Sequence, residues 1–253
     1  MSTDTPRASG TAPWPAGVDR LILDETDSTN AEAARRSASL ARRPTWIMAR
    51  RQTAARGRRG RAWAAPDGNL SATCLLFPDE PPHIAALRSF VAANALFDAL
   101  AQFVDPARLA LKWPNDLLFD GGKAAGILLE SAGQRGGLDW LAIGIGVNLA
   151  SAPPRDAAAT VAPVALGLDL APEDMLTALA VAFAAEEAQF RAQGFAPIRE
   201  KWLARAARLG EVVTARTARE TLTGRFEDLD PSGELLLSTP LGPRRIAAAD
   251  VFF

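Results

Sequence analysis

The chain has 253 residues, of which 48% are hydrophobic and 23% charged, which leaves room for one large domain or a large and a small one. Its formal net charge of -1 excludes a global attraction to nucleic acid or to an anionic membrane, so any basic function must be local. A single cysteine, Cys74, and a single histidine, His83, exclude an intramolecular disulfide and leave too few soft ligands for a structural zinc site.

Three further expectations follow from these counts. No apolar stretch is long enough to span a bilayer, and residues 1–17 lack the order of a signal peptide and are predicted to be a disordered tail, so we expect a cytoplasmic protein. Cys74 lies in an apolar run and is expected in the core. His83 follows two prolines and is expected to be exposed or capping rather than catalytic.

The first helix is predicted to begin near Thr29 and to run to about Leu40, because Thr29 and Glu32 have the spacing of a capping box. Further elements of the large domain follow from hydrophobic periodicity. Strands are expected at 21–24, 45–49, 69–77, 108–113, 124–130 and 139–148, and helices at 83–103, 172–193 and 197–209. Asp120-Gly121-Gly122 has the composition of a hairpin turn.

The sequence changes character at Gly210. Short strands are expected at 211–215, 221–228, 234–238 and 244–253, with Asp230-Pro231-Ser232-Gly233 as a turn. The predicted fold class is therefore α+β: a mixed central sheet with packed helices over residues 18–207, and a small C-terminal module resembling a β-barrel over residues 208–253.

A basic segment runs from just before the second predicted strand into the loop that joins it to the third. Eight arginines and no acidic residue lie between Arg42 and Arg61, and Gly57 and Gly60 interrupt the run Arg56–Arg61. Arginines spaced around glycine can present several guanidinium groups to a phosphate or a carboxylate. A solvated basic loop and a nucleic-acid patch explain the same composition, so this segment alone leaves three interpretations open.

Lysine is rare in this chain, since only three of its 28 basic residues are lysines. One begins Lys112-Trp113-Pro114-Asn115-Asp116, where the proline should end a strand and leave Asn115 and Asp116 on a loop. Such a loop can place a cation, an amide and a Mg²⁺-binding carboxylate around a nucleotide, or it can be a simple turn with Trp113 in the core. Lys123 follows a tight turn and is either a solvated guard of a sheet edge or a cation directed into a cleft.

Gly144-Ile145-Gly146-Val147-Asn148 places two glycines in an otherwise apolar strand. Glycines at such positions indicate the close approach of a ligand or of another part of the chain. The segment lacks the complete dinucleotide-binding pattern, and the chain has no Walker-type phosphate loop, so ATP would have to be bound in another way.

Together with Asp27-Ser28-Thr29-Asn30, and in this order, these segments resemble the catalytic domain of bacterial biotin–protein ligases. The resemblance covers roughly residues 20–205, and the region from about 210 resembles the small SH3-like C-terminal domain of that family. Only about twenty residues precede the first strand, too few for the DNA-binding domain of the bifunctional members, so the chain resembles the monofunctional type.

The resemblance implies roles for individual residues. It implies biotin binding by Ser28, Thr29, Asn30, Gln52, Arg56, Gly57, Arg58 and Lys123. It implies ATP binding by Arg58, Arg61, Trp63, Asn115, Lys123 and Asn148, and catalytic roles for Lys123, Arg58 and Asp116, with Asp116 also a Mg²⁺ ligand. The chain departs from the family at Ala55, where the loop usually has glycine. If that position needs a positive φ, alanine costs of order 1 kcal/mol in the closed loop.

The resemblance also implies an activity. Biotin and ATP would give biotinyl-5'-AMP and pyrophosphate, and biotin would then pass to a lysine on the biotin carboxyl carrier domain of a carboxylase. ATP, Mg²⁺ and biotin are the expected small molecules; neither DNA nor a membrane is an expected partner, and a homodimer is a possible assembly. The alternatives are a lipoate–protein ligase, an octanoyl transferase that would have to use Cys74, and a nucleic-acid-binding protein that uses the basic segment.

Overall fold

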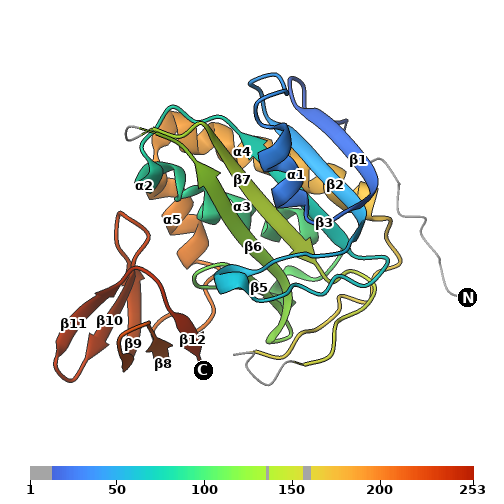
Figure 1. The fold of residues 1–253 in the computed structure, drawn as a ribbon. Coiled ribbons are helices and arrows are strands. Elements are labelled where there is room, and N and C mark those ends of the chain that lie inside the picture. The colour runs from blue at the N-terminus through green and yellow to red at the C-terminus, as the bar shows by residue number, and fades with distance from the viewer. Residues whose placement is uncertain (1–12, 135–136, 156–160) are drawn as a thin grey trace, which may run out of the picture.

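The computed structural model describes residues 13–134, 137–155 and 161–253, so most of the predicted tail, residues 1–12, lies outside the described residues. The large sheet has seven strands in the order β1-β2-β3-β7-β6-β5-β4 (Figure 1). Its strands are β1 (Asp19–Thr26), β2 (Thr45–Gln52), β3 (Leu70–Leu76), β4 (Leu109–Lys112), β5 (Asp116–Phe119), β6 (Gly122–Ala132) and β7 (Trp140–Val147). Strands β1 and β2 are parallel and all the other neighbours are antiparallel, so the sheet is mixed.

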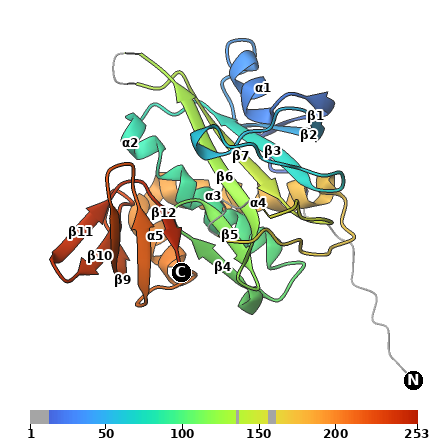
Figure 2. The ribbon, with the colours of Figure 1, turned by 60° about the horizontal axis from the view of Figure 1, so that its bottom comes forward.

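Helices lie on both faces of this sheet. Their bounds are α1 (Thr29–Arg36), α2 (Pro82–Ala85), α3 (Arg88–Leu100), α4 (Pro172–Gln193) and α5 (Phe195–Leu203). Helices α3, α4 and α5 pack against one another on one face, whereas α1 contacts strands β2, β3 and β7 from the other face (Figure 2).

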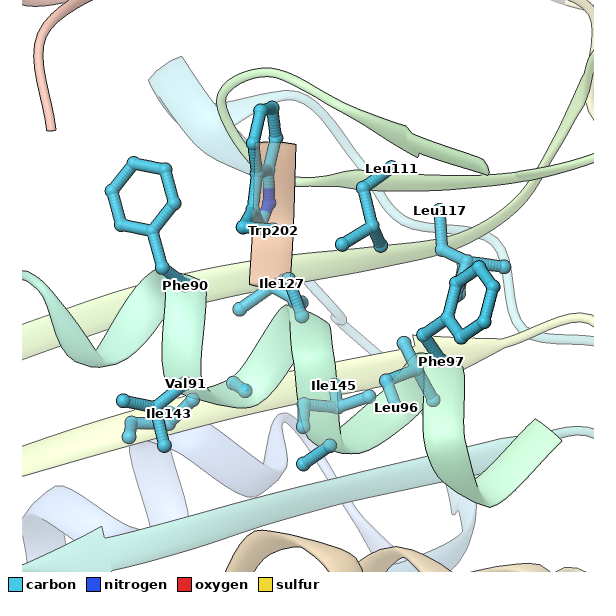
Figure 3. Close-up of a cluster of buried hydrophobic side chains, with 14 of the residues drawn as sticks. Phe90, Val91, Leu96, Phe97, Leu111, Leu117, Ile127, Ile143, Ile145 and Trp202 are labelled. Carbon is cyan, nitrogen blue, oxygen red and sulfur yellow. The ribbon is translucent and has the colours of Figure 1, made fainter. Parts of the chain in front are cut away.

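The main core lies between α3 and the sheet. Figure 3 shows Phe90, Val91, Leu96 and Phe97 of α3 beside Ile127 of β6, Ile143 and Ile145 of β7, and Trp202 of α5. Each such side chain contributes about 1.5–3 kcal/mol when it is fully buried. This burial fixes which face of β6 and β7 is turned inward, and so leaves their other face available for a binding site.

A second sheet follows at the C-terminus, with the order β11-β10-β9-β8-β12. Its strands are β8 (Val212–Arg216), β9 (Thr221–Leu229), β10 (Leu235–Thr239), β11 (Gly242–Ile246) and β12 (Asp250–Phe252), and all its pairings are antiparallel. The predicted fold class, a mixed sheet with packed helices followed by a small all-β module, is confirmed. Among the residues that the structure describes, no helix is both long and apolar enough to cross a membrane.

The predicted capping box of the first helix is wrong. Ser28 rather than Thr29 is the N-cap residue, and its side chain makes no capping hydrogen bond. Glu32 instead binds the two arginines of the last turn, Arg35 and Arg36. The helix ends at Arg36 rather than near Leu40.

Other boundaries also differ from the prediction. The helix expected at 197–209 is α5, which ends at Leu203. The helix expected at 83–103 is interrupted after Ala85, where the backbone forms a tighter turn through the bond from the Leu87 amide to the Ile84 carbonyl. Asp116 is the first residue of β5, paired with Lys112, because the chain reverses within Trp113-Pro114-Asn115 and a strand follows at once. The single strand expected at 244–253 is two strands, β11 and β12.

The turn before β10 joins the two sheets. Gly233 has a φ of +79°, and the Trp113 indole nitrogen donates a hydrogen bond to its carbonyl at 3.1 Å. A Cβ on Gly233 would lie 2.5 Å from Cε2 of Phe90 in α3. This glycine therefore allows the C-terminal sheet to pack closely against the helical layer.

We expect Gly233→Ala to lower the free energy of unfolding by about 2–5 kcal/mol, because the backbone strain of a positive φ adds to a clash with a core aromatic ring. Gly167→Ala is the matched control, since Gly167 also has a positive φ but no atom lies within 4 Å of the added Cβ. We expect the control to lose only about 1–2 kcal/mol. Urea denaturation measures both, and equal losses would contradict the close packing described at this turn.

Candidate active site

A cavity of about 280 Å³ opens on the face of the large sheet that α3 does not cover. Residues of the loop that joins β2 to β3 line it, and this loop crosses the sheet in Figure 1. Segments from the whole chain line it, including residues 28–30, 55–58, 61–64 and 114–116, the glycine face of β6 and β7, and residues 249–251 of the C-terminal module. A cavity close to the lower end of the usual range, about 300–1,000 Å³, fits a small molecule.

The floor of the cavity is made by the glycines of β7. Ile143 and Ile145 point into the core, so Gly144 and Gly146 face the cavity. A Cβ on Gly144 would collide with the Asn30 side chain, and a Cβ on Gly146 would lie 2.5 Å from the Trp63 indole nitrogen. The predicted close approach at these glycines is confirmed. Two residues of a strand span roughly 7 Å, so Asn30 and Trp63 mark two separate ends of an elongated site.

The first end of the site is polar and already ordered. Asn30 is 4% exposed, accepts a hydrogen bond from Thr73 Oγ1 at 2.7 Å, and donates one to Glu130 Oε2 at 2.8 Å. Gln52 Oε1 accepts a hydrogen bond from the Thr29 amide at 2.8 Å. These bonds hold the side chains in fixed orientations, as recognition of a small polar group requires.

The second end concentrates positive charge. Lys123 Nζ lies 2.7 Å from Asp116 Oδ1 and 5.4 Å from the centre of the Trp63 ring. Lys112 also lines the cavity and is 3% exposed. Burial lowers the pKa of the Lys112 ammonium, while the Asp116 carboxylate opposes this shift.

Arg58 adds a third cation at the same end. Its guanidinium donates to Asn115 Oδ1 at 3.2 Å, and Asn115 is itself held by a bond from its Nδ2 to the Ile127 carbonyl at 2.7 Å. Burial lowers the pKa of the Arg58 guanidinium, as does the charge of neighbouring Arg59. Among the described residues at this end, three cations surround one carboxylate, Asp116, and this excess of positive charge favours a bound anion.

The loop over the cavity is a narrow hairpin. The Gly57 amide donates to the Arg61 carbonyl at 2.7 Å, and the Trp63 amide donates to the Ala55 carbonyl at 3.0 Å. Ala55 does not have a positive φ, so the backbone cost considered for alanine at this position does not arise in this conformation. The left-handed residues are Arg59 and Gly60, at the tip.

The structure brings together nearly all of the residues implied by the resemblance. The cavity is lined by Ser28, Thr29, Asn30, Gln52, Arg56, Gly57, Arg58, Arg61, Trp63, Asn115, Asp116 and Lys123. Asn148 is the exception: its side chain is 1% exposed and donates to the Val164 carbonyl at 3.1 Å, beside the cavity wall. A role for Asn148 in ATP binding stays a prediction.

Two charged residues that line the cavity, Lys112 and Asp250, were not among the predicted site residues. Lys112 was noted only as part of its motif, although the rarity of lysine in this chain could have marked it as a site residue. Asp250 is separated from Arg61 by 189 residues, and no local pattern in the sequence connects the two.

The predicted Mg²⁺ site can be compared with the side chains that could bind a metal ion. Among the described residues, no group of three or more His, Cys, Asp or Glu side chains could hold a metal ion. Asp116 Oδ1 is nevertheless buried, and its charge is balanced by Lys123 Nζ at 2.7 Å. One such carboxylate suits Mg²⁺, which is commonly held by one or two carboxylates together with substrate phosphates and water.

Cys74 and His83 lie where the sequence predicts. Cys74 is fully buried in β3, and burial raises the pKa of its thiol, which opposes formation of the nucleophilic thiolate. His83 is exposed on α2, and neither residue lines the cavity.

Comparisons with known proteins match nearly the whole chain. Residues 22–148 match the family described as "Biotin/lipoate A/B protein ligase family", and residues 209–253 match "Biotin protein ligase C terminal domain". The chain is 52% identical to the biotin–[acetyl-CoA-carboxylase] ligase of Paracoccus denitrificans, over 92% of this chain and 99% of the relative. It is 30% identical to the bifunctional ligase/repressor BirA of Bacillus subtilis, over 91% of this chain and 71% of the relative.

A solved structure extends this similarity to three dimensions. The biotin protein ligase from Aquifex aeolicus in complex with biotin and ATP superposes with a TM-score of 0.77 at 26% identity. The superposition covers 92% of this chain and 97% of that chain.

We expect Asn30→Asp to destabilise the protein by about 2–4 kcal/mol near pH 8, because a carboxylate would replace the amide that donates to Glu130. The charge of Glu130 would raise the folded-state pKa of the new carboxyl above its unfolded value of about 3.9. The folded state would then bind more protons, so the deficit relative to wild type should shrink at about pH 5.

Urea denaturation at both pH values measures this change. The double variant Asn30→Asp/Glu130→Gln is the control, since it lacks the opposing charge and should show a weaker pH dependence. A deficit of the same size at both pH values would mean that Asn30 does not depend on donating to Glu130.

Proposed function

The chain belongs to the biotin/lipoate A/B protein ligase family, and we propose that within it the protein is an ATP-dependent biotin–protein ligase. It activates the carboxylate of biotin with ATP and then transfers the biotinyl group to a lysine of a carrier domain of a biotin-dependent carboxylase. One observation carries the proposal: the cations and the aromatic ring expected for such an adenylate site lie in one cavity of a chain that is 52% identical to a biotin–[acetyl-CoA-carboxylase] ligase.

Biotin lies along β7 in this proposal. Thr29, Asn30 and Gln52 bind the polar ring system at the ordered end of the cavity, where Gly144 leaves room for the Asn30 side chain. The valeryl carboxylate reaches Lys123 of β6 at the other end of the cavity, about two residues of β7 away from Gly144. Trp63, with its indole over Gly146, lies beside the nucleotide.

The first half-reaction joins a carboxylate oxygen of biotin to the α-phosphorus of ATP and breaks the bond from that phosphorus to pyrophosphate. The carboxylate is already ionised at neutral pH, so no base is needed. The task of the protein is to bring two anions together and to stabilise the charge of the transition state. Lys123 and Arg58 supply this positive charge next to Asp116 and Asn115.

Mg²⁺ would neutralise phosphate charge in this step, and Asp116, whose carboxylate lines the cavity beside Lys123, is the residue that would hold it. Asn115 lies next to it in the chain and keeps Arg58 directed into the cavity.

The second half-reaction forms an amide between the acceptor lysine and the biotinyl carbonyl carbon, and AMP leaves. The attacking amine must be neutral and must lose a proton during the reaction. Asp116 is our candidate for accepting this proton, since its carboxylate faces the cavity at 11% exposure.

The contacts of the basic segment argue against the alternative that the protein binds nucleic acid. Six of its eight arginines form ion pairs within the chain, and Arg58 binds Asn115. Guanidinium groups held in this way are less available to a phosphate backbone. The burial of Cys74 likewise opposes an acyl-cysteine route. A reducing, cytoplasmic location fits a protein with one buried thiol.

We expect pyrophosphate exchange into ATP to depend on biotin and to be at least about a hundredfold weaker with lipoate or octanoate, because the polar end of the cavity would be left unpaired. Isotope exchange with each acid, together with calorimetric titration of a short DNA duplex, measures this preference. Exchange that runs equally well with lipoate would contradict the choice of biotin, and binding of the duplex alone would contradict the enzyme.

We expect Lys123→Ala to reduce biotin-dependent pyrophosphate exchange by about a hundredfold or more, because the charge that bridges the two reacting anions is lost. Lys201→Ala is the control, since Lys201 pairs with Asp98 and Glu186 away from the cavity. Both variants are compared at a temperature where thermal denaturation finds them folded. Exchange at the wild-type rate in Lys123→Ala would remove Lys123 from the reaction.

A further inference from the structure

The C-terminal sheet contributes one charged side chain to the edge of the cavity. Asp250 begins β12, lines the cavity and is 11% exposed. Its carboxylate accepts a hydrogen bond from Arg59 Nη1 at 2.7 Å and another from Arg61 Nη2 at 3.0 Å. Both arginines belong to the loop over the cavity, so one carboxylate of the C-terminal module holds the tip of that loop.

The arginine side chains of the loop point in two directions. Arg58 points to Asn115 inside the cavity, whereas Arg59 does not line the cavity and turns to Asp250. The left-handed backbone of Arg59, with a φ of 56°, produces this change of direction, and Gly60 with a φ of 72° continues it. A left-handed arginine is unfavourable by itself, so the turn needs an attraction that holds it, and Asp250 provides one.

The strand that carries Asp250 also holds its carboxylate in a fixed position. The backbone of Asp250 pairs with Arg216 of β8, and its neighbours Ala249 and Val251 are 0% and 4% exposed. Burial would raise the pKa of the Asp250 carboxyl, but Arg61 and Arg59 outweigh this effect and the pKa lies below its ordinary value. The carboxylate therefore stays charged at neutral pH and is anchored in a packed strand.

We propose that Asp250 is a positioning residue that latches the arginine loop over the cavity and so slows the escape of the acyl-adenylate before the acceptor lysine arrives. The proposal rests on the proposed function for the identity of the intermediate, but not for the latch itself. Asp250 acts through Arg59 and Arg61. Loss of its charge leaves Lys123 of β6 in place but allows the loop, which carries Arg58, to open more often.

Amide hydrogen exchange of the ligand-free protein tests the latch without any substrate. The amides of Gly57, Arg61 and Trp63 are bonded within the loop, so their exchange reports its opening. We expect Asp250→Asn to speed their exchange about fivefold, and Arg59→Gln to do so by a smaller factor. Added salt should speed the exchange of these amides in the wild type and have little effect in Asp250→Asn, because the attraction it screens is already lost.

Asp228→Asn is the matched control. Asp228 also joins the C-terminal sheet to the large domain, through an ion pair with Arg199 of α5, but it lies outside the cavity lining. We expect the loop amides to exchange at the wild-type rate in this variant. Equal acceleration in Asp228→Asn, or none in Asp250→Asn and Arg59→Gln, would overturn the latch. Arg59→Gln keeps the test valid if Asp250→Asn does not fold, since Arg59 is 45% exposed.

Release of the intermediate tests the consequence. Labelled biotin and ATP are allowed to form the adenylate on each protein, and release is followed after an excess of unlabelled biotin is added. We expect release from Asp250→Asn to be about fivefold faster than from the wild type or from Asp228→Asn. Equal release rates would overturn the proposal. Failure of the wild type to form any adenylate would instead refute the proposed function and leave the hydrogen exchange result as the test of the latch.

Discussion

Strand β7 lies at the centre of the large sheet, and its alternation of isoleucine and glycine decides where the core and the cavity lie. Ile143 and Ile145 pack against α3, while Gly144 and Gly146 leave the opposite face bare. Successive side chains of a strand point to opposite faces, so one short segment buries the core and opens the site. Asn30 and Trp63 take their places because no Cβ stands in the way.

A second constraint concerns the charges of the site. An anionic intermediate needs several cations close together, and these cations must be held in position against their mutual repulsion. Asp116 lies between the cations inside the cavity and pairs with Lys123. Asp250 holds Arg59 and Arg61 at its outer edge. Each carboxylate fixes positive groups in position before a ligand arrives, which lowers the cost of arranging them during the reaction.

The order of several short segments, and their resemblance to one family, predicted much of this arrangement, although each segment alone left alternatives open. The glycines of β7 indicated the close approach of a ligand or of another part of the chain, and Lys123 was left open between a guard of a sheet edge and a cation directed into a cleft. The resemblance of the segments to the ligase family then implied that they form one site. The capping box failed because Glu32 found stronger partners in Arg35 and Arg36, and the loop assigned to Asp116 is a strand because the turn closes within three residues. Asp250 could not be predicted, since its pairing with Arg61 bridges 189 residues and depends on how the two sheets pack.

The central claim is that this cavity joins biotin to a protein through an adenylate. The most direct measurement is the intact mass of an isolated biotin carboxyl carrier domain after incubation with the protein, biotin and ATP·Mg²⁺, together with the amounts of AMP and pyrophosphate released. We expect one biotinyl group on one lysine, with one AMP and one pyrophosphate formed for each group transferred. A carrier domain whose mass does not change, although the protein is folded and all three components are present, would contradict the account.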